Sequence, residues 1–137
     1  MQKMMLMLAI VLCAGFSASA QKKIPPAAVV AAFNQKFSNV EELKWKLEKN
    51  GEWEAEFEQE EVDMSANFSA DGKWVETETE IKVSNLPASV QAAVKGKRVR
   101  EAAKIDRADG TTVYEAEIRR KDFVYDAQGT LISQGKD

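Results

Sequence analysis

The sequence predicts an α+β fold: a tandem repeat in which each unit is a helix plus a four-stranded antiparallel meander, with the helices packed on one face of the sheet. Three observations indicate this fold. Apolar residues alternate with polar ones over several runs, proline opens two short runs of helical spacing, and turn dipeptides separate the alternating runs. Strict alternation is typical of antiparallel strands that have one buried face and one solvated face.

The two runs of helical spacing follow Pro26 and Pro87. Their apolar members are Val29, Val30, Phe33 and Phe37 in the first run and Val90, Ala93 and Val94 in the second. Proline suits the first turn of a helix because its missing N–H would have no helical partner there. Helices this short are not stable alone, so we expect both to dock on the strands.

The alternating runs cover residues 44–48, 52–58, 62–68 and 75–81, and then 114–118, 123–125 and 131–132. Turn dipeptides lie between them, at Asn50-Gly51, Asp71-Gly72, Asp109-Gly110 and Gln128-Gly129. In this phase Phe57 and Ile118 are equivalent buried strand residues, with Trp45 and Trp53 also in the core.

Internal similarity divides the chain. Residues 26–33 resemble 87–94, residues 53–57 resemble 114–118, and residues 68–72 resemble 125–129. The order of the three matches is the same in both halves. We therefore expect a single domain over residues 21–137, made of two repeats at about 24–83 and 84–136.

The amino terminus has the pattern of a signal peptide. Lys3 precedes an apolar run over residues 4–16, and small residues end at Ala20, where we expect cleavage. The apolar run is shorter than the ~20 residues that a helix needs to cross a bilayer, so no stable membrane insertion is expected after cleavage. Cys13 follows Leu12 inside this run, which does not fit a lipoprotein, and is lost with the peptide. The mature protein is expected to be periplasmic or secreted.

Several chemistries lack their residue types. The chain has no histidine, and its one cysteine is Cys13. Histidine-dependent catalytic triads and thiolate metal sites are therefore excluded, and the glycines do not form a phosphate loop. We expect no catalytic residues, no metal and no cofactor. The net charge of −3 does not favour nucleic acid as a partner.

The first half of the chain is strongly acidic. Residues 24–83 contain 6 lysines and 14 acidic residues, whereas residues 84–137 contain 10 basic and 8 acidic residues. An alternating acidic run, from Glu52 to Asp63, is either a solvated strand face or a docking surface for a basic partner. A calcium site is a third reading, although carboxylates along a strand point apart.

Trp74 is out of phase with the apolar set and in phase with glutamates. This places it on the solvated face, and the candidate binding residues are Trp74, Glu54, Glu56, Glu76 and Glu78. Alternatively, Trp74 packs over the sheet edge just after the Asp71-Gly72 turn. The basic residues Lys95, Lys97, Arg98, Arg100, Arg119, Arg120 and Lys121 are a solvated surface or a partner for the acidic unit of a second molecule, which leaves a homo-oligomer open.

Residues 114–118 and 123–132 resemble the core hairpins of the PepSY domain. Together with Leu86-Pro87 and residues 71–78, they are similar to the PepSY-like, beta-lactamase-inhibitor-like family of exported Bacteroidetes proteins. The resemblance spans residues 24–136. It implies a helix-plus-meander protein whose sheet offers a broad, concave surface, which in the related inhibitor grips an enzyme. The family supplies no catalytic residue to carry over.

These observations favour a non-catalytic exported binding module, a protein inhibitor or interaction domain that binds another exported protein through its exposed sheet face. The alternative from a different class is a cell-envelope sensor or buffer that binds a small ligand or a cation such as calcium.

Overall fold

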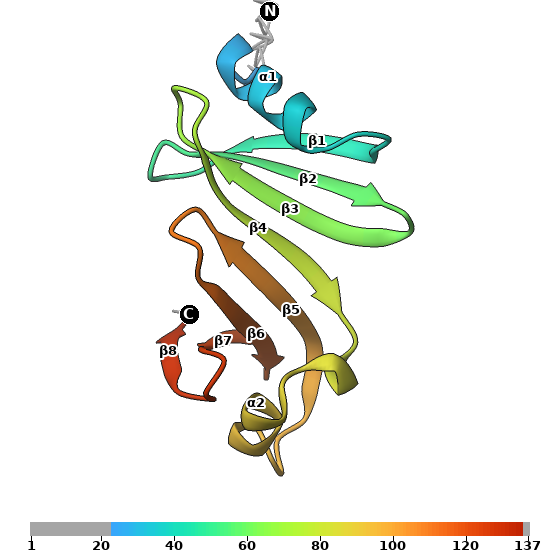
Figure 1. The fold of residues 1–137 in the computed structure, drawn as a ribbon, viewed down its shortest axis with the longest axis vertical. Coiled ribbons are helices and arrows are strands. Elements are labelled where there is room, and N and C mark those ends of the chain that lie inside the picture. Colours follow the sequence, from blue (N-terminus) through green and yellow to red (C-terminus); the bar gives the residue numbers. More distant parts are fainter. Residues whose placement is uncertain (1–22, 136–137) are drawn as a thin grey trace, which may run out of the picture.

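The computed structural model describes residues 23–135, so the predicted signal peptide lies outside the described residues. Figure 1 shows α1 with the first strands at one end of the molecule and α2 with the last strands at the other. The elements are α1 (Ala27–Lys36), β1 (Glu41–Leu47), β2 (Trp53–Gln59), β3 (Val62–Phe68), β4 (Trp74–Ile81), the 3₁₀ turn η1 (Val83–Asn85), α2 (Ala88–Ala93), β5 (Val99–Arg107), β6 (Thr112–Ile118), β7 (Lys121–Tyr125) and β8 (Leu131–Gln134).

The predicted tandem repeat of a helix and a four-stranded meander is wrong. All eight strands form one antiparallel sheet in the order β1 to β8, without a break between the halves. Strand β4 pairs with β5 from Glu76↔Arg107 to Ile81↔Ala102. Within residues 23–135, α1 is the only α-helix longer than two turns: it has ten residues, whereas α2 has six.

Backbone hydrogen bonding explains the single sheet. Two separate meanders would leave β4 and β5 as edges with unpaired N–H and C=O groups, and their pairing satisfies these groups. The second helix ends early because Val94 leaves helical geometry and Gly96 follows with a φ of +80°. The antiparallel alternation on which the prediction rested is confirmed in β2 and β6.

The register divides the side chains between two faces. Ala55, Ala66, Thr77 and Asp106 pair in turn across β2 to β5 and therefore share a face. We call this side, on which the core residues contact both helices, the helix-covered face. The opposite side is the helix-free face.

The core under α1 is aromatic. Phe33 is 1% exposed, and its ring centroid lies 5.1 Å from that of Phe57 and 5.3 Å from that of Trp45. Trp53 and Phe68 complete this buried cluster. The sequence-based prediction that Trp53 and Phe57 are core residues is confirmed.

The core under α2 is mainly aliphatic, with Tyr125 as its buried aromatic residue. Leu86, Val90 and Val94 lie against Ala116 and Ile118 in a cluster separate from the aromatic one. Ile118 is 6% exposed, which confirms its prediction as a buried strand residue. The two clusters therefore stabilise opposite ends of one continuous sheet.

Glycine turns bring the sheet close to both helices. Gly72 has a φ of +88°, and a Cβ built on it would lie 2.6 Å from the carbonyl oxygen of Ala28 in α1. Gly129 has a φ of +81°, and its Cβ would lie 2.4 Å from the carbonyl oxygen of Ser89 in α2. Both positions require glycine because of their backbone conformation and because of these contacts.

Candidate functional site

A groove of about 480 Å³ lies along the helix-free face. Its lining is dominated by acidic side chains from β1 to β7. We call the following residues the acidic groove: Glu42, Glu54, Glu56, Glu58, Asp63, Glu78, Glu80, Glu101, Glu115, Glu117 and Asp122. Lys44 is the one basic residue in that lining.

Strand pairing brings these carboxylates together. Glu56 pairs with Ser65, which pairs with Glu78, so the acidic side chains of β2 and β4 flank a small residue. The pairing of β4 with β5 then joins the acidic residues of the first half to Glu115 and Glu117 of β6. Because helices cover the other side, the acidic groove is left open to a partner.

The helix-free face also contains a few apolar residues. Ile105, Val113 and Val124 form a small buried cluster there, and each is at most 8% exposed. Glu115 lies between Ala103 and Val124 in the register, and both of these neighbours are buried. Ile105, Val113 and Val124 do not line the acidic groove, so they contribute to the packing of the sheet and not to the groove surface.

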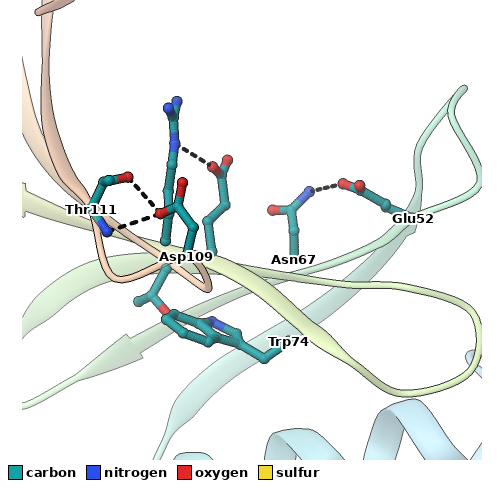
Figure 2. Close-up of polar contacts among 8 residues, drawn as sticks. Glu52, Asn67, Trp74, Asp109 and Thr111 are labelled. Carbon is teal, nitrogen blue, oxygen red and sulfur yellow. Dashed lines mark hydrogen bonds and ion pairs between the residues drawn. The ribbon is translucent and has the colours of Figure 1, made fainter.

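Trp74 lies on the opposite face from the glutamates with which it was grouped. Asn67 pairs with Glu76, but the next residue, Phe68, pairs with Trp74, so the register shifts at this point. Such a bulge moves a side chain to the other side of the sheet. Figure 2 shows the Trp74 side chain on the opposite side of the ribbon from that of Asn67.

The contacts of Trp74 are those of a packing residue. Its ring lies against the aromatic core, and the Nζ of Lys36 in α1 is 3.7 Å from the ring centroid. The indole Nε1 donates a hydrogen bond to Thr77 Oγ1 at 2.9 Å. The alternative from the sequence, that Trp74 packs over the sheet edge after the Asp71-Gly72 turn, fits only in part: Trp74 does pack, but on a central strand and against the core of the helix-covered face.

The four predicted glutamates share the helix-free face, and they differ in their partners. Glu54 lies 3.4 Å from Lys46, and Glu76 lies 3.3 Å from the Nε of Arg107. Among residues 23–135, no ion pair within 4.0 Å neutralises Glu56 or Glu78. Glu54, Glu56 and Glu78 line the acidic groove, whereas Glu76 lies beyond its border.

The sequence missed the acidic residues that the second half contributes. Glu101, Glu115, Glu117 and Asp122 all line the acidic groove. The alternation could have revealed two of them, because Tyr114, Ala116 and Ile118 were assigned to the buried face, which leaves Glu115 and Glu117 on the other.

Crowding and burial perturb the groove carboxyls. Burial, and after it the nearby carboxylates of Glu78 and Asp122, together raise the pKa of Glu115 to about 8. Burial also raises the pKa of Glu78, with Asp122 and Glu54 adding to the effect. At neutral pH the Glu115 carboxyl is therefore largely protonated.

This shift predicts a pH-dependent stability. The folded pKa of Glu115 is raised from 4.5 to about 8, so the folded state binds its proton more tightly than the unfolded chain does. Its contribution to stability is full below the unfolded pKa and is lost as the pH rises through the folded pKa. We expect Glu115→Gln to melt several degrees above the wild type at about pH 8 and close to it at about pH 4.

Thermal melts followed by circular dichroism measure this effect. Glu101→Gln is the matched control, because Glu101 also lines the acidic groove but is exposed. The same melting temperature for wild type and Glu115→Gln at both pH values would show that Glu115 is solvated and ionises normally.

The calcium reading gains no support from the geometry. Within the described part of the chain, no group of three or more acidic, histidine or cysteine side chains is placed to hold a metal ion. Along the sheet the carboxylates form rows instead of converging on one point.

In residues 23–135 no helix has the length and apolar character needed to span a membrane.

Several solved structures from Bacteroides share this fold. The chain superposes on a Bacteroides eggerthii structure described as "putative periplasmic proteins" with a TM-score of 0.72 and 15% identity, covering 82% of this chain and 88% of that one. A DUF2874 family protein from Bacteroides ovatus matches with a TM-score of 0.71 and 18% identity, covering 82% and 87%. A BLIP-like protein from Bacteroides fragilis matches with a TM-score of 0.66 and 20% identity, covering 82% and 86%.

At 15–20% sequence identity, the similarity to these structures shows a shared fold. No curated protein is significantly similar to the chain. Residues 51–133, which are more than half of the sequence, match the family described as "Putative beta-lactamase-inhibitor-like, PepSY-like". This match includes six strands of the sheet in full and every groove residue except Glu42. The chain therefore belongs to the beta-lactamase-inhibitor-like, PepSY-like family.

Proposed function

We propose that this protein is a non-catalytic module of the cell envelope that binds a basic surface of another exported protein through its acidic groove. The observation that carries the proposal is the gathering of eleven acidic side chains and one lysine on the side of the sheet that no helix covers. Family membership and the periplasmic description of one structural relative support it.

The groove suits a protein partner with protruding lysine or arginine side chains. Glu56 and Glu78 have no ion pair in the described part of the chain, so a partner cation would gain a charge contact without breaking an existing one. Such surfaces accelerate association and select partners more than they add affinity.

A binding role of this kind also fits the lack of catalytic residue types. The chain has no histidine, and the raised pKa of Glu115 has a structural cause in burial and neighbouring carboxylates. The family's description as beta-lactamase-inhibitor-like supports a role as an inhibitor or interaction domain.

The test compares two charge-matched variants as immobilised bait for a cell-envelope extract. Glu56→Gln/Glu78→Gln removes two groove charges, whereas Asp71→Asn/Asp109→Asn removes two charges from turns that do not line the groove. We expect the wild type and the turn variant to retain the same basic protein at low salt, and the groove variant to hold it roughly three- to tenfold more weakly. Retention that is equal for all three baits, or absent at low salt, would contradict the proposal.

A further inference from the structure

The connections between strands lie along two opposite borders of the sheet, at the two ends of the strands. These two borders differ in charge and in their contacts. In a meander, alternate connections lie on the same border. One border carries the turns of Gly72 and Gly129, which contact the helices. The other carries the β2–β3 turn, the connection from β4 to β5, and the β6–β7 turn. We call this second border the charged border.

Two tight hairpin tips with opposite charge lie on the charged border. The β2–β3 tip is Glu60-Glu61 and the β6–β7 tip is Arg119-Arg120, and all four residues have a φ between +52° and +63°. Glycine and asparagine are the residues that this hairpin turn favours, so both tips keep charged residues at positions where the backbone does not favour them. The four side chains are exposed.

Further basic residues gather next to the Arg119-Arg120 tip. Val99 pairs with Ile118, which brings the loop before β5 beside the turn after β6. That loop holds Lys95, Lys97 and Arg98, all exposed. We call these three residues with Arg119 and Arg120 the basic tip.

Acidic residues gather in the same way near the Glu60-Glu61 tip. Glu58 pairs with Asp63 directly before and after this turn, and both residues line the acidic groove. Burial raises the pKa of Glu58, and neighbouring carboxylates, Asp63 foremost among them, raise it as well. This end of the acidic groove thus opens on the charged border.

We propose that two copies of the chain form a two-fold symmetric dimer in which the basic tip of each copy docks at the Glu58–Asp63 end of the other's acidic groove. The inference rests on the groove that carries the proposed function, but it does not need the other protein. Since the two complementary parts lie on one border, a single rotation pairs both at once and closes the assembly at two copies.

The spacing and the middle of the border are compatible with this symmetry. The two hairpins are four strand positions apart, roughly 19 Å along the sheet. Between them lies Val83, a large apolar residue that is 36% exposed. A two-fold axis midway between the tips would bring the two copies of Val83 towards each other, so the contact would have an apolar centre and a charged rim.

Charge reversal on either side of the contact tests the dimer. Arg119→Glu/Arg120→Glu reverses the basic tip, and Glu58→Lys/Asp63→Lys reverses the end of the groove. By sedimentation velocity at low salt, we expect the wild type to have twice the mass of one chain and each variant to have the mass of one chain. In about 0.5 M NaCl the wild type should also dissociate.

Mixing the two variants is the decisive arm. The acidic tip of one variant matches the basic groove of the other, and the unchanged tip and groove match as well, so the mixture should recover the doubled mass. A mixture that stays monomeric, or a wild type that is monomeric at low salt, overturns the proposal. Arg119→Gln/Arg120→Gln serves if a reversed variant fails to melt cooperatively, and it should weaken the dimer at least several-fold.

The two proposals fail separately. A monomeric wild type that still binds a short oligolysine peptide in the groove would refute the dimer and keep the proposed function. A wild type that stays monomeric and binds anionic vesicles through Arg119 and Arg120 would instead assign the basic tip to a membrane surface.

Discussion

Phe57→Ala should lower the free energy of unfolding by about 3–5 kcal/mol, because removing the large ring leaves a cavity in a closed aromatic core. Phe57 is 4% exposed, and its ring centroid lies 4.8 Å from that of Phe37 and 5.1 Å from that of Phe33. These three rings attach α1 to the sheet, so the cavity could not be filled by a small shift of one residue. For a domain whose total stability is about 5–15 kcal/mol, the loss is a large fraction.

Chemical denaturation measures this loss directly. Ile132→Ala is the control, since Ile132 is 49% exposed and should change stability by no more than about 0.5 kcal/mol. Ile118→Ala should cost about 2–5 kcal/mol in the second cluster. If Phe57→Ala hardly changed the free energy of unfolding, the register of β2 would be shifted by one residue. Every β2 side chain would then lie on the opposite face of the sheet.

Gly72→Ala and Gly129→Ala should each cost about 2–5 kcal/mol, the sum of about 1–2 for the left-handed backbone and 1–3 for overpacking. The added methyl group would lie 2.6 Å or 2.4 Å from a helix carbonyl oxygen, and a backbone atom cannot move aside as a side chain does. Each helix would therefore have to leave its position on the sheet.

Two other glycines provide the matched control. Gly51 has a φ of +89° and Gly110 a φ of +83°, and a Cβ at either would have no neighbour within 4 Å. Gly51→Ala and Gly110→Ala should therefore cost only the backbone part, about 1–2 kcal/mol. Equal losses of stability in all four variants would show that the helices do not rest on the turns.

Where a strand is regular, the local alternation of apolar and polar residues was sufficient to predict which side chains are buried. The alternation of β2 and β6 placed Trp53, Phe57 and Ile118 in the core because one face of each strand is buried and the other is solvated. The sequence identified the turn glycines as well, although it could not show that two of them touch a helix.

The pattern failed where the register shifts or where both faces are apolar. A shift between Asn67 and Phe68 moves Trp74 to the helix-covered face, and no local signal marks it. Strand β5 was not recognised as an alternating run, because Ala102, Ala103 and Ile105 are buried on both faces and a bulge follows Val99.

The acidic groove is a tertiary property. The sequence suggested an acidic face on the first half alone, since the expected boundary near residue 83 separated it from Glu115 and Glu117. Pairing of β4 with β5 places both halves in one sheet and adds the second set of carboxylates. The candidate site therefore keeps Glu54, Glu56 and Glu78, places Glu76 beside it, and loses Trp74.

We expect the helix-free face, and not the face of Trp74, to bind a cationic partner. Titrating the ¹⁵N-labelled protein with a short oligolysine peptide at low salt, followed by NMR, tests it most directly. We expect saturable shifts of the amides of Glu56, Glu78 and Glu115, abolished in the Glu56→Gln/Glu78→Gln variant and by added salt, with the Trp74 indole N–H unmoved. Shifts that centre on Trp74 and α1, or no shifts at low salt, would contradict the claim.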